Sequence, residues 1–496
     1  MKTHKKLVTL KILDEVNVVF IGLRDVDTTY LVEKFKVFAR NYRFSPKYTL
    51  GPWDGKIQFF YPTGKTYIQL VPEVMAYLSK QSYKIKLKDT RQKFDVKLPT
   101  IDENYLSDYG ITLGKHQMDA VNALTQNQGG IFLGGTGAGK TYITAILAKL
   151  YYENLNLKTI IVVPTADLID QTIAELKKFI DVGEYSGATK DTNHPCVVST
   201  WQALQNNKAI LSKFQIAIID ECHGVRGEVL RDMLNDHGKN ICVKIGVTGT
   251  LPKDEIDKMA VRITLGNVQH ITTAASLIKS GWLATPTLEL LQLEEDVHDM
   301  YDEYLVVTKE KPVMTYAKFK QNAFDDYVAE KAYIRNNEER NEFIANKIEK
   351  LRTQKKGNTF ILVNSVVYGK KLVKLIDDAH FVHGKDEKKA RREIYDLFTE
   401  NDDIVVIATF QLASTGLDIK RIFNLIFIDA GKSFIQIIQG IGRGLRKAHD
   451  KDSVYILDIC SDFKYARRHL TQRMAHYRGE MYEFTKKKID YLRQMM

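Results

Sequence analysis

Short runs of apolar, mostly β-branched residues alternate with longer amphipathic stretches through most of this 496-residue chain. Such runs are typical of strands buried on both faces of a parallel sheet, and the stretches between them are typical of the connecting helices. The first series of predicted strands comprises 131–133, 159–163, 196–199, 216–219 and 244–247, and the second comprises 359–363, 404–408, 425–428 and 454–459. The two series predict two α/β domains in tandem.

The pattern differs outside these two series. Strands are predicted at 7–12 and 16–21 and a helix at 27–39, so that residues 1–98 form a small α/β domain. Polar residues rich in Tyr, Asp, Glu and Lys separate the two series, where a helical insert is expected. The predicted boundaries are 1–98 for the N-terminal domain, 110–285 for the first parallel-sheet domain, 286–350 for a linker and helical insert, 351–463 for the second parallel-sheet domain, and 464–496 for a basic helical extension.

Positive charge is concentrated at the two ends of the chain. The net charge is +11, and residues 1–100 carry 19 Lys and Arg against 9 Asp and Glu. Residues 464–496 carry a further excess of +6, which leaves residues 101–463 slightly acidic. A basic end domain predicts a polyanionic partner, most simply nucleic acid, although a solvated basic face is the alternative at either end.

The remaining composition excludes several classes of protein. The chain contains no run of about 18 apolar residues, so no membrane span is expected. Acidic residues interrupt the apolar N-terminal stretch, which is therefore not expected to be a signal peptide. The four cysteines form no C-x-x-C pair, which favours reduced thiols in the cytoplasm over a disulfide or zinc framework.

A glycine-dense loop joins the predicted strand 131–133 to a predicted helix. The loop fits the phosphate-binding pattern G-x-x-x-x-G-K-[ST], in which backbone N–H groups approach phosphate oxygens. In that pattern Lys140 reaches the β- and γ-phosphates and the Thr141 hydroxyl ligates Mg²⁺. We therefore expect ATP and Mg²⁺ as cofactors, with the nucleotide held by Gly134, Gly135, Thr136, Gly137, Ala138, Gly139, Lys140 and Thr141.

Two carboxylates follow the buried run 216–219. A strand that delivers Asp220 and Glu221 at its carboxyl end supplies what a P-loop ATPase needs after its phosphate loop. Asp220 is expected to hold Mg²⁺ together with Thr141, and Glu221 to polarise the attacking water.

A P-loop followed by Asp220-Glu221-Cys222-His223 resembles the superfamily 2 helicases, and further segments resemble the motifs of that family in the expected order. The resemblance implies two RecA-like domains in tandem, with ATP between them. It implies an adenine contact for Gln117, nucleic-acid contacts for Pro164, Thr165 and Thr200, and coupling of hydrolysis to domain movement by His223, Thr248 and Thr250. A satisfied histidine at a strand end remains the alternative for His223.

The second series of strands carries the remaining motifs of this resemblance. Gln439, Arg443 and Arg446 fit the pattern Q-x-x-G-R-x-x-R. The two arginines lie one helical turn apart, so both can stabilise charge on a transferring phosphoryl group. The fifth motif implies nucleic-acid contacts for Thr409 and Thr415 and nucleotide contacts for Gly416 and Asp418.

The segment between residues 42 and 61 resembles the front domain of the UvsW family of phage recombination helicases. Its Gly-Pro-Trp-Asp-Gly sequence predicts a turn that carries phosphate-binding and base-stacking side chains. The candidates are Arg43, Lys47, Trp53 and Lys56. For Trp53, a place in the core of the small domain remains an equal alternative.

The expected function is an ATP-dependent DNA helicase or translocase that remodels branched DNA in recombination and repair. The resemblance implies a monomer in the cytoplasm of a host cell, with DNA and with replication or recombination proteins as partners and no membrane. The alternatives are a double-stranded DNA translocase that does not separate strands, an RNA helicase, and a nucleic-acid clamp with a vestigial ATP site. The intact Lys140, Asp220 and Glu221 argue against the clamp.

Overall fold

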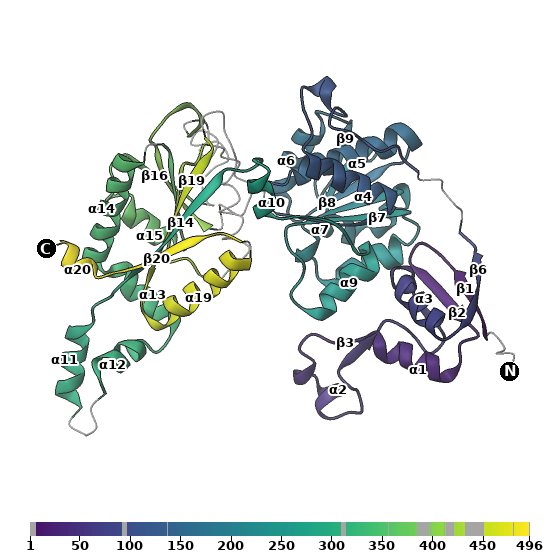
Figure 1. The fold of residues 1–496 in the computed structure, drawn as a ribbon, viewed down its shortest axis with the longest axis horizontal. Helices are drawn as coiled ribbons and strands as arrows, with labels where there is room; N and C mark the ends of the chain where they lie inside the picture. Colours follow the sequence, from purple (N-terminus) through teal and green to yellow (C-terminus); the bar gives the residue numbers. More distant parts are fainter. Residues whose placement is uncertain are drawn as a thin grey trace. The chain divides into compact units, whose positions relative to one another are not determined.

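The computed structural model describes residues 6–91, 97–135, 137–308, 314–355, 357–383, 396, 398–410, 412, 421–431, 451–479 and 481–495. The chain forms two compact units, Met1–Thr272 and Thr273–Met496. The first unit contains the N-terminal domain and the first parallel sheet, and the second unit contains the other parallel sheet (Figure 1). The expectation of two parallel-sheet domains behind a small α/β domain is confirmed.

The N-terminal domain is built on a four-stranded mixed sheet in the order β5-β2-β1-β6. Strands β1 and β2 are antiparallel, and β1 and β6 are parallel. A separate two-stranded sheet, β3-β4, lies beyond it. The elements are β1 (Lys6–Ile12), β2 (Asn17–Ile21), α1 (Asp25–Lys34), β3 (Lys36–Phe38), α2 (Pro46–Thr49), β4 (Lys56–Gln58), β5 (Lys65–Tyr67), α3 (Val71–Lys80) and β6 (Tyr83–Asp89). Helix α1 therefore ends five residues before the predicted boundary, because the chain turns into β3.

The first parallel sheet has seven strands in the order β13-β7-β12-β11-β8-β10-β9, and its paired strands are all parallel. The carboxyl ends of the strands therefore share one edge, where ligands of α/β proteins bind. The strands are β7 (Gly129–Gly134), β8 (Thr159–Val163), β9 (Val182–Tyr185), β10 (Cys196–Thr200), β11 (Ile216–Asp220), β12 (Val243–Thr248) and β13 (Val268–Thr272).

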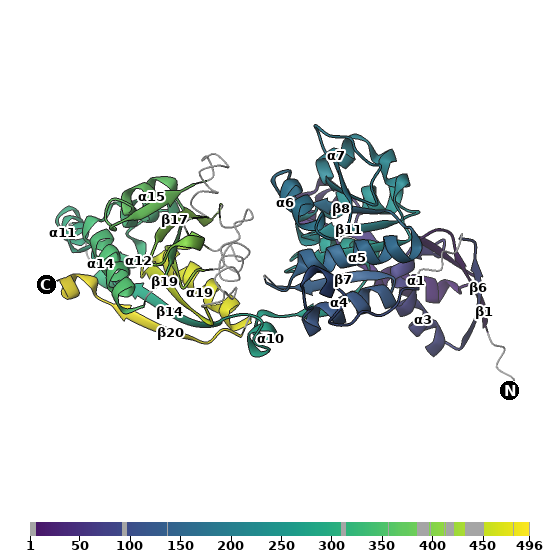
Figure 2. The same cartoon turned by 90° about the horizontal axis from the view of Figure 1, so that it is seen from above.

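Helices cover both faces of this sheet, as two views of the unit show (Figures 1 and 2). Strands β8, β10 and β12 are buried throughout, which explains their continuous apolar runs. The helices are α4 (Lys115–Gln126), α5 (Lys140–Leu155), α6 (Asp167–Leu176), α7 (Trp201–Asn206), α8 (Gly227–Arg231) and α9 (Glu255–Leu265).

Helix α9 joins the N-terminal domain to the first sheet. Its Ile263 is buried in the core of the N-terminal domain, and its Ile256 and Met259 pack against that core. Arg262 of α9 also forms an ion pair with Glu73 of α3. The N-terminal domain and the helix that covers the first sheet therefore share one hydrophobic core.

The second unit contains seven parallel strands in the order β16-β17-β15-β18-β19-β14-β20. The strands are β14 (Thr285–Leu293), β15 (Thr359–Val363), β16 (Ala379–Val382), β17 (Val405–Thr409), β18 (Asn424–Ile428), β19 (Ser453–Ser461) and β20 (Phe484–Ile489). The helices within the described residues of this unit are α10 (Ala274–Lys279), α11 (His298–Val307), α12 (Tyr316–Asn322), α13 (Tyr327–Asn336), α14 (Glu338–Gln354), α15 (Val366–Leu372), α19 (Lys464–Gly479) and α20 (Tyr491–Met495).

Two of the predicted boundaries in this unit need correction. Residues 286–293 are not linker, since β14 pairs with β19 along its whole length, and α14 packs in the core of the second sheet. The helical insert is therefore limited to α11–α13. The C-terminal extension is not only helical, because β20 pairs with β14. Its Thr485 and the three consecutive lysines after it are exposed, which is typical of an edge strand.

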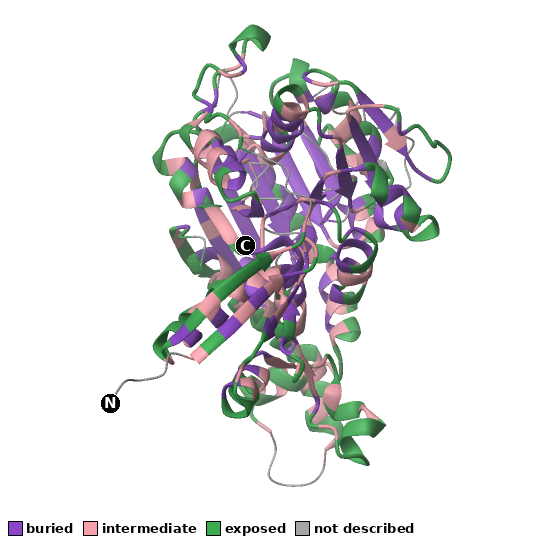
Figure 3. Cartoon of the chain, turned by 90° about the vertical axis from the view of Figure 1, so that its right-hand side faces the viewer, coloured by how far each residue is buried: buried purple, intermediate pink, exposed green. Residues whose placement is uncertain are grey.

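Buried residues concentrate in the strands, and the exposed residues lie mainly on the outer faces of helices and in the loops (Figure 3). Within the described ranges, no helix combines the length and the apolar character that a membrane crossing requires. All four cysteines are free thiols.

Candidate active site

The phosphate loop lies between β7 and α5, at the carboxyl edge of the first sheet. Gly139 precedes α5 with φ +75°, and a Cβ atom at this position would lie 2.1 Å from Nε2 of Gln117. Only glycine therefore fits at this position. The N–H groups of the first turn of α5 have no partners within the helix, which suits an anion. Thr136 of the loop is outside the described residues.

Gln117 lies beside this loop. The side chain is 3% exposed, and its Oε1 accepts a hydrogen bond from the backbone N–H of Gly114 at 2.9 Å. On the adjacent residue, Nε2 of His116 lies 3.2 Å from the carbonyl oxygen of Ala138 in the loop. The Gln117 side chain thus closes the first turn of α4 and lies next to Gly139 of the phosphate loop.

Strand β11 delivers the two predicted carboxylates next to the loop. Nζ of Lys140 lies 2.9 Å from Oε1 of Glu221, and Glu221 has a φ of +45° directly after the strand. Burial and the Glu221 carboxylate raise the pKa of Asp220 to about 6. Burial opposes ionisation of Glu221, but Lys140 and His223 hold the pKa of Glu221 well below its usual range.

A hydrogen-bonded network extends from Glu221 to the end of β12. Nδ1 of His223 lies 2.6 Å from the Thr248 hydroxyl and 3.2 Å from Oε2 of Glu221. The Thr248 hydroxyl lies 2.9 Å from the Thr250 carbonyl oxygen, to which it can donate. A tautomer of His223 that carries its proton on Nδ1 satisfies these contacts. The structure thus brings the three predicted coupling residues together beside Lys140 and Glu221.

The donor set fits Mg²⁺ with a nucleotide better than a metal held by protein alone. Among the described residues, no cluster of three or more His, Cys, Asp or Glu could hold a metal ion. P-loop proteins hold Mg²⁺ with one hydroxyl, one carboxylate, phosphate oxygens and water. The Thr141 hydroxyl and the Asp220 carboxylate are the corresponding groups here.

The predicted nucleic-acid contacts of the first sheet lie on the same edge, beyond β11. Strands β8 and β10 are neighbours, with Thr200 opposite Val163, so Pro164 and Thr165 lie beside Thr200. Thr165 is exposed and Pro164 is half-buried. Thr200 is the most buried of these three residues. It is 5% exposed, and its hydroxyl accepts a hydrogen bond from the N–H of Ala203 at 3.3 Å, which caps α7.

The second predicted half of the site belongs to the second unit. Thr415, Gly416, Asp418, Gln439, Arg443 and Arg446 lie outside the described residues. Thr409 ends β17, where it is buried and its hydroxyl accepts a hydrogen bond from the N–H of Leu412 at 3.4 Å.

The four N-terminal candidates lie on the β3-β4 region. Arg43 and Lys47 are exposed, and Trp53 and Lys56 are half-buried. The indole N–H of Trp53 donates to the carbonyl oxygen of Lys56 at 2.8 Å, which holds the turn closed. Trp53 does not belong to the core cluster of the N-terminal domain.

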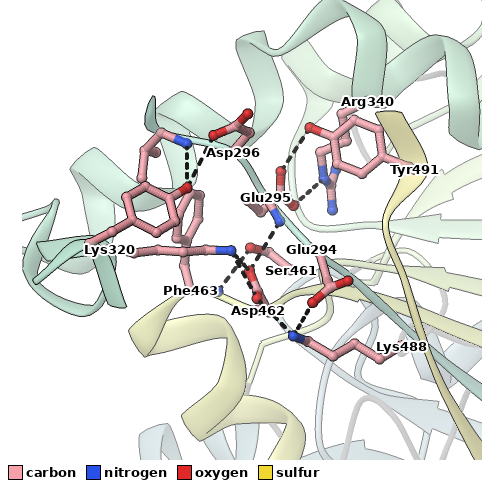
Figure 4. Close-up of polar contacts among 12 residues, drawn as sticks. Glu294, Glu295, Asp296, Lys320, Arg340, Ser461, Asp462, Phe463, Lys488 and Tyr491 are labelled. Carbon is pink, nitrogen blue, oxygen red and sulfur yellow. Dashed lines mark hydrogen bonds and ion pairs between the residues drawn. The ribbon is translucent and has the colours of Figure 1, made fainter. Parts of the chain in front are cut away.

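A buried charge network in the second unit was not predicted from the sequence. Arg340 of α14 is fully buried; its Nε donates to Oε1 of Glu295 at 2.8 Å and its Nη2 donates to Oδ1 of Asp429 at 2.7 Å. Asp429 follows β18, and Glu295 follows β14. Figure 4 shows Arg340 with Glu295 and the neighbouring Asp462–Lys320 pair.

Three family models match this chain. They are "Type III restriction enzyme, res subunit" over residues 110–253, "Helicase conserved C-terminal domain" over 340–448, and "DNA helicase UvsW, N-terminal" over 13–88. With the two parallel sheets and the P-loop site, they identify the chain as an ATP-dependent DNA helicase of superfamily 2 with a UvsW-type N-terminal domain.

Individual relatives agree with this assignment. The chain is 26% identical over 499 residues to the ATP-dependent DNA helicase uvsW of Enterobacteria phage T4, which covers 92% of this chain and 94% of the phage protein. It is 25% identical over 416 residues to the DNA 3'-5' translocase XPB2 of Sulfurisphaera tokodaii, covering 77% and 92% of the two chains. The fold is similar to that of the Type ISP restriction-modification enzyme LlaBIII bound to DNA, with a TM-score of 0.54 and 13% identity, covering 85% of this chain and 36% of that one.

Proposed function

We propose that this helicase uses ATP hydrolysis to remodel branched DNA during recombination and repair, by branch migration of junctions, regression of forks and removal of displacement loops or R-loops. One observation carries the proposal. Helix α9 begins at Glu255, five residues after Thr250 of the hydrolysis network, and its Ile263 is buried in the core of the basic N-terminal domain. A change at the ATP site therefore has a packed route to a domain whose charge suits DNA.

The residues of the first sheet have separate roles in this proposal. The loop 134–141 and Lys140 hold the phosphates, and Thr141 and Asp220 hold Mg²⁺, which neutralises charge on the transferring phosphoryl group when it is bound. Glu221 orients the attacking water, because Lys140 and His223 keep its carboxylate ionised. His223, Thr248 and Thr250 transmit the state of that carboxylate toward α9. Gln439, Arg443 and Arg446 are proposed to complete the site, with Gly416 and Asp418 contacting the nucleotide.

DNA is proposed to follow the same edge of the sheet past Thr165 and the backbone at Thr200, with Thr409 and Thr415 contributing from the second unit. Arg43, Lys47 and Lys56 then bind the backbone of a duplex arm. We propose a monomer in the cytoplasm of the host cell that works beside replication and recombination proteins.

The decisive experiment is a strand-displacement panel with the purified full chain. A four-way junction, a fork, a displacement loop and an RNA–DNA hybrid are each incubated with ATP and with a non-hydrolysable analogue. Displacement from the branched DNA substrates that requires hydrolysis supports the proposal. Hydrolysis stimulated by duplex DNA with no displacement on any branched DNA would instead identify a translocase, and a preference for the hybrid would favour an RNA-directed enzyme.

Two sets of variants test the assigned residues. Lys140→Ala removes a cation beside the phosphates and should lower hydrolysis by about a hundredfold or more, whereas Lys149→Ala, on the same helix, should not. Arg43→Ala with Lys47→Ala should reduce the slope of log affinity against log salt by about 2, because each lost phosphate contact lowers it by about 0.9. Lys239→Ala, an exposed lysine of the first sheet domain, is the control. Point variants are preferable to deleting the N-terminal domain, since deletion would expose the apolar face of α9.

A further inference from the structure

Residues 36–58 form a separate projection on the N-terminal domain, which we call the tip. It contains β3, α2 and β4, and its backbone extends away from the four-stranded sheet (Figure 1). The tip carries five Lys and Arg against one Asp. It is short, yet its conformation is tightly specified.

An aromatic cluster holds the tip together. The ring of Tyr42 stacks on Phe38 with centroids 4.5 Å apart and meets the edge of Tyr48 at 5.0 Å. Gly55 lies against this cluster with φ +77°, where a Cβ atom would come within 2.5 Å of the Tyr42 ring. The guanidinium of Arg43 and the ammonium of Lys56 lie over Tyr42 and Phe38 at 5.7 Å and 5.1 Å. These contacts preorganise the tip without using its outermost side chains.

Two large apolar side chains remain outside this cluster. Phe44 is 87% exposed and Leu50 is 89% exposed, at the two ends of the short segment that contains α2. Apolar side chains that stay in water contribute no hydrophobic stabilisation to the fold. Exposed apolar groups rimmed by polar residues often mark interaction sites. Arg43 directly precedes Phe44, and Lys47 lies midway between Phe44 and Leu50, so two cations accompany the apolar pair along the chain.

The tip is also fixed to the motor domain. Arg40 forms ion pairs with Asp254, at 3.3 Å, and with Asp257, both at the beginning of α9. The backbone N–H of Gly227 in α8 donates to Asp257 at 3.2 Å, which holds that carboxylate in place. A force on the tip is therefore borne by the helix that follows the hydrolysis network.

We propose that Phe44 and Leu50 are a strand-separating pin, which inserts between bases at the branch point of a DNA junction. The inference rests on the proposed function and adds the element that divides the strands. Phe and Leu are among the side chains that proteins insert between base steps to unstack them. Stacking of an unpaired base on an aromatic ring strengthens its binding by about tenfold or more. The surrounding lysines and arginines bind the backbones of the separated arms.

The charge of the tip favours DNA over a protein as the occupant. An apolar pair that docks a protein has no need of cations beside it, whereas a junction presents unstacked bases between two polyanionic backbones. Binding of a protein partner is nevertheless a distinct outcome of the test below, because purified components would then show no defect.

The test compares the wild type with Phe44→Ala/Leu50→Ala, Phe44→Trp and the control Val26→Ala. Val26 is 65% exposed on α1 of the same domain, away from the tip. The measured quantity is the number of base pairs opened on a fork per ATP hydrolysed. We expect the double variant to lower this ratio by about tenfold and Phe44→Trp to retain it. An unchanged ratio in the double variant overturns the proposal, and so does an equal loss in Val26→Ala. Thermal melting of each variant establishes that the domain is folded.

A second measurement is independent of hydrolysis. A fork with 2-aminopurine at the branch point, mixed with protein in the absence of ATP, reports unstacking as increased fluorescence. Wild type should increase it and the double variant should not, although both bind the fork. If wild type increases the fluorescence yet displaces no strand with ATP, the pin stands and the proposed function fails. If wild type leaves it unchanged, the pin is refuted whatever the helicase activity.

Discussion

Replacing Arg340 with Met should destabilise the second unit severely. The guanidinium is fully buried and donates to Glu295, which is also fully buried, and to Asp429. Met fills a similar volume but leaves a buried carboxylate without a cation. Breaking a buried ion pair in this way costs about 3–5 kcal/mol, which lowers the melting temperature by on the order of 10 °C for a unit of this size.

The loss of stability in Arg340→Met should depend on pH in a defined direction. Burial raises the pKa of Glu295 even with Arg340 beside it, and removal of Arg340 raises that pKa further. Ionisation of such a group costs stability as the pH rises above its unfolded-state pKa of about 4.3. The difference between Arg340→Met and wild type should therefore be smaller at pH 5 than at pH 8. Adding Glu295→Gln to Arg340→Met should recover at least about 1 kcal/mol.

Calorimetry gives the melting temperatures, and hydrogen exchange of peptides from α14 and α5 shows which unit has lost stability. Lys350→Met, an exposed position on the same helix, is the matched control and should change stability by less than about 0.5 kcal/mol. A loss for Arg340→Met that is as small as the control, or that is the same at pH 5 and pH 8, would refute the reasoning.

Three further predictions concern the first unit. Lys244→Met should stabilise the protein by about 1–3 kcal/mol at pH 7, because the buried ammonium of Lys244 has no hydrogen-bond partner among the described residues. Burial lowers the pKa of Lys244 to about 8. The stability gained by the variant, measured by denaturant unfolding, should therefore disappear as the pH rises from 8 toward 10. Asp27→Asn should cost about 1–3 kcal/mol at pH 7. Burial opposes ionisation of Asp27, but hydrogen bonds from Arg24 and two tyrosines lower its pKa to about 2. The contribution of Asp27 to folding stability is therefore present above pH 4 and is lost as the pH falls toward 2. Equal unfolding curves for wild type and Asp27→Asn at pH 7 would contradict this. His223→Ala should raise the number of ATP molecules consumed per base pair opened by about tenfold, because the link between Glu221 and Thr248 is lost. If an assay that follows hydrolysis and strand opening together shows the same ratio as wild type, His223 is a structural residue.

The sequence by itself determined the local elements and the first half of the ATP site. Continuous apolar runs predict strands buried on both faces, and these strands were found within a residue or two of their predicted ends. The phosphate loop and the Asp220–Glu221 pair were also predictable, since a short chemical pattern at a strand end needs only the local backbone. Lys140 and Glu221 meet because strands β7 and β11 are parallel and separated only by β12.

Only the tertiary structure decided which distant segments belong together. Strand β14 lies in the second sheet because its partners, β19 and β20, come more than 150 residues later, and no local pattern encodes that pairing. Arg340 meets partners 45 and 89 residues away in the sequence, where each charge alone suggested a solvated surface. The hydroxyl of Thr200 caps a helix, since short polar side chains satisfy the nearest backbone group first. Local pattern thus specifies strands, helices and phosphate loops, whereas burial of charge and exposure of Phe44 and Leu50 depend on what the folded chain places around them.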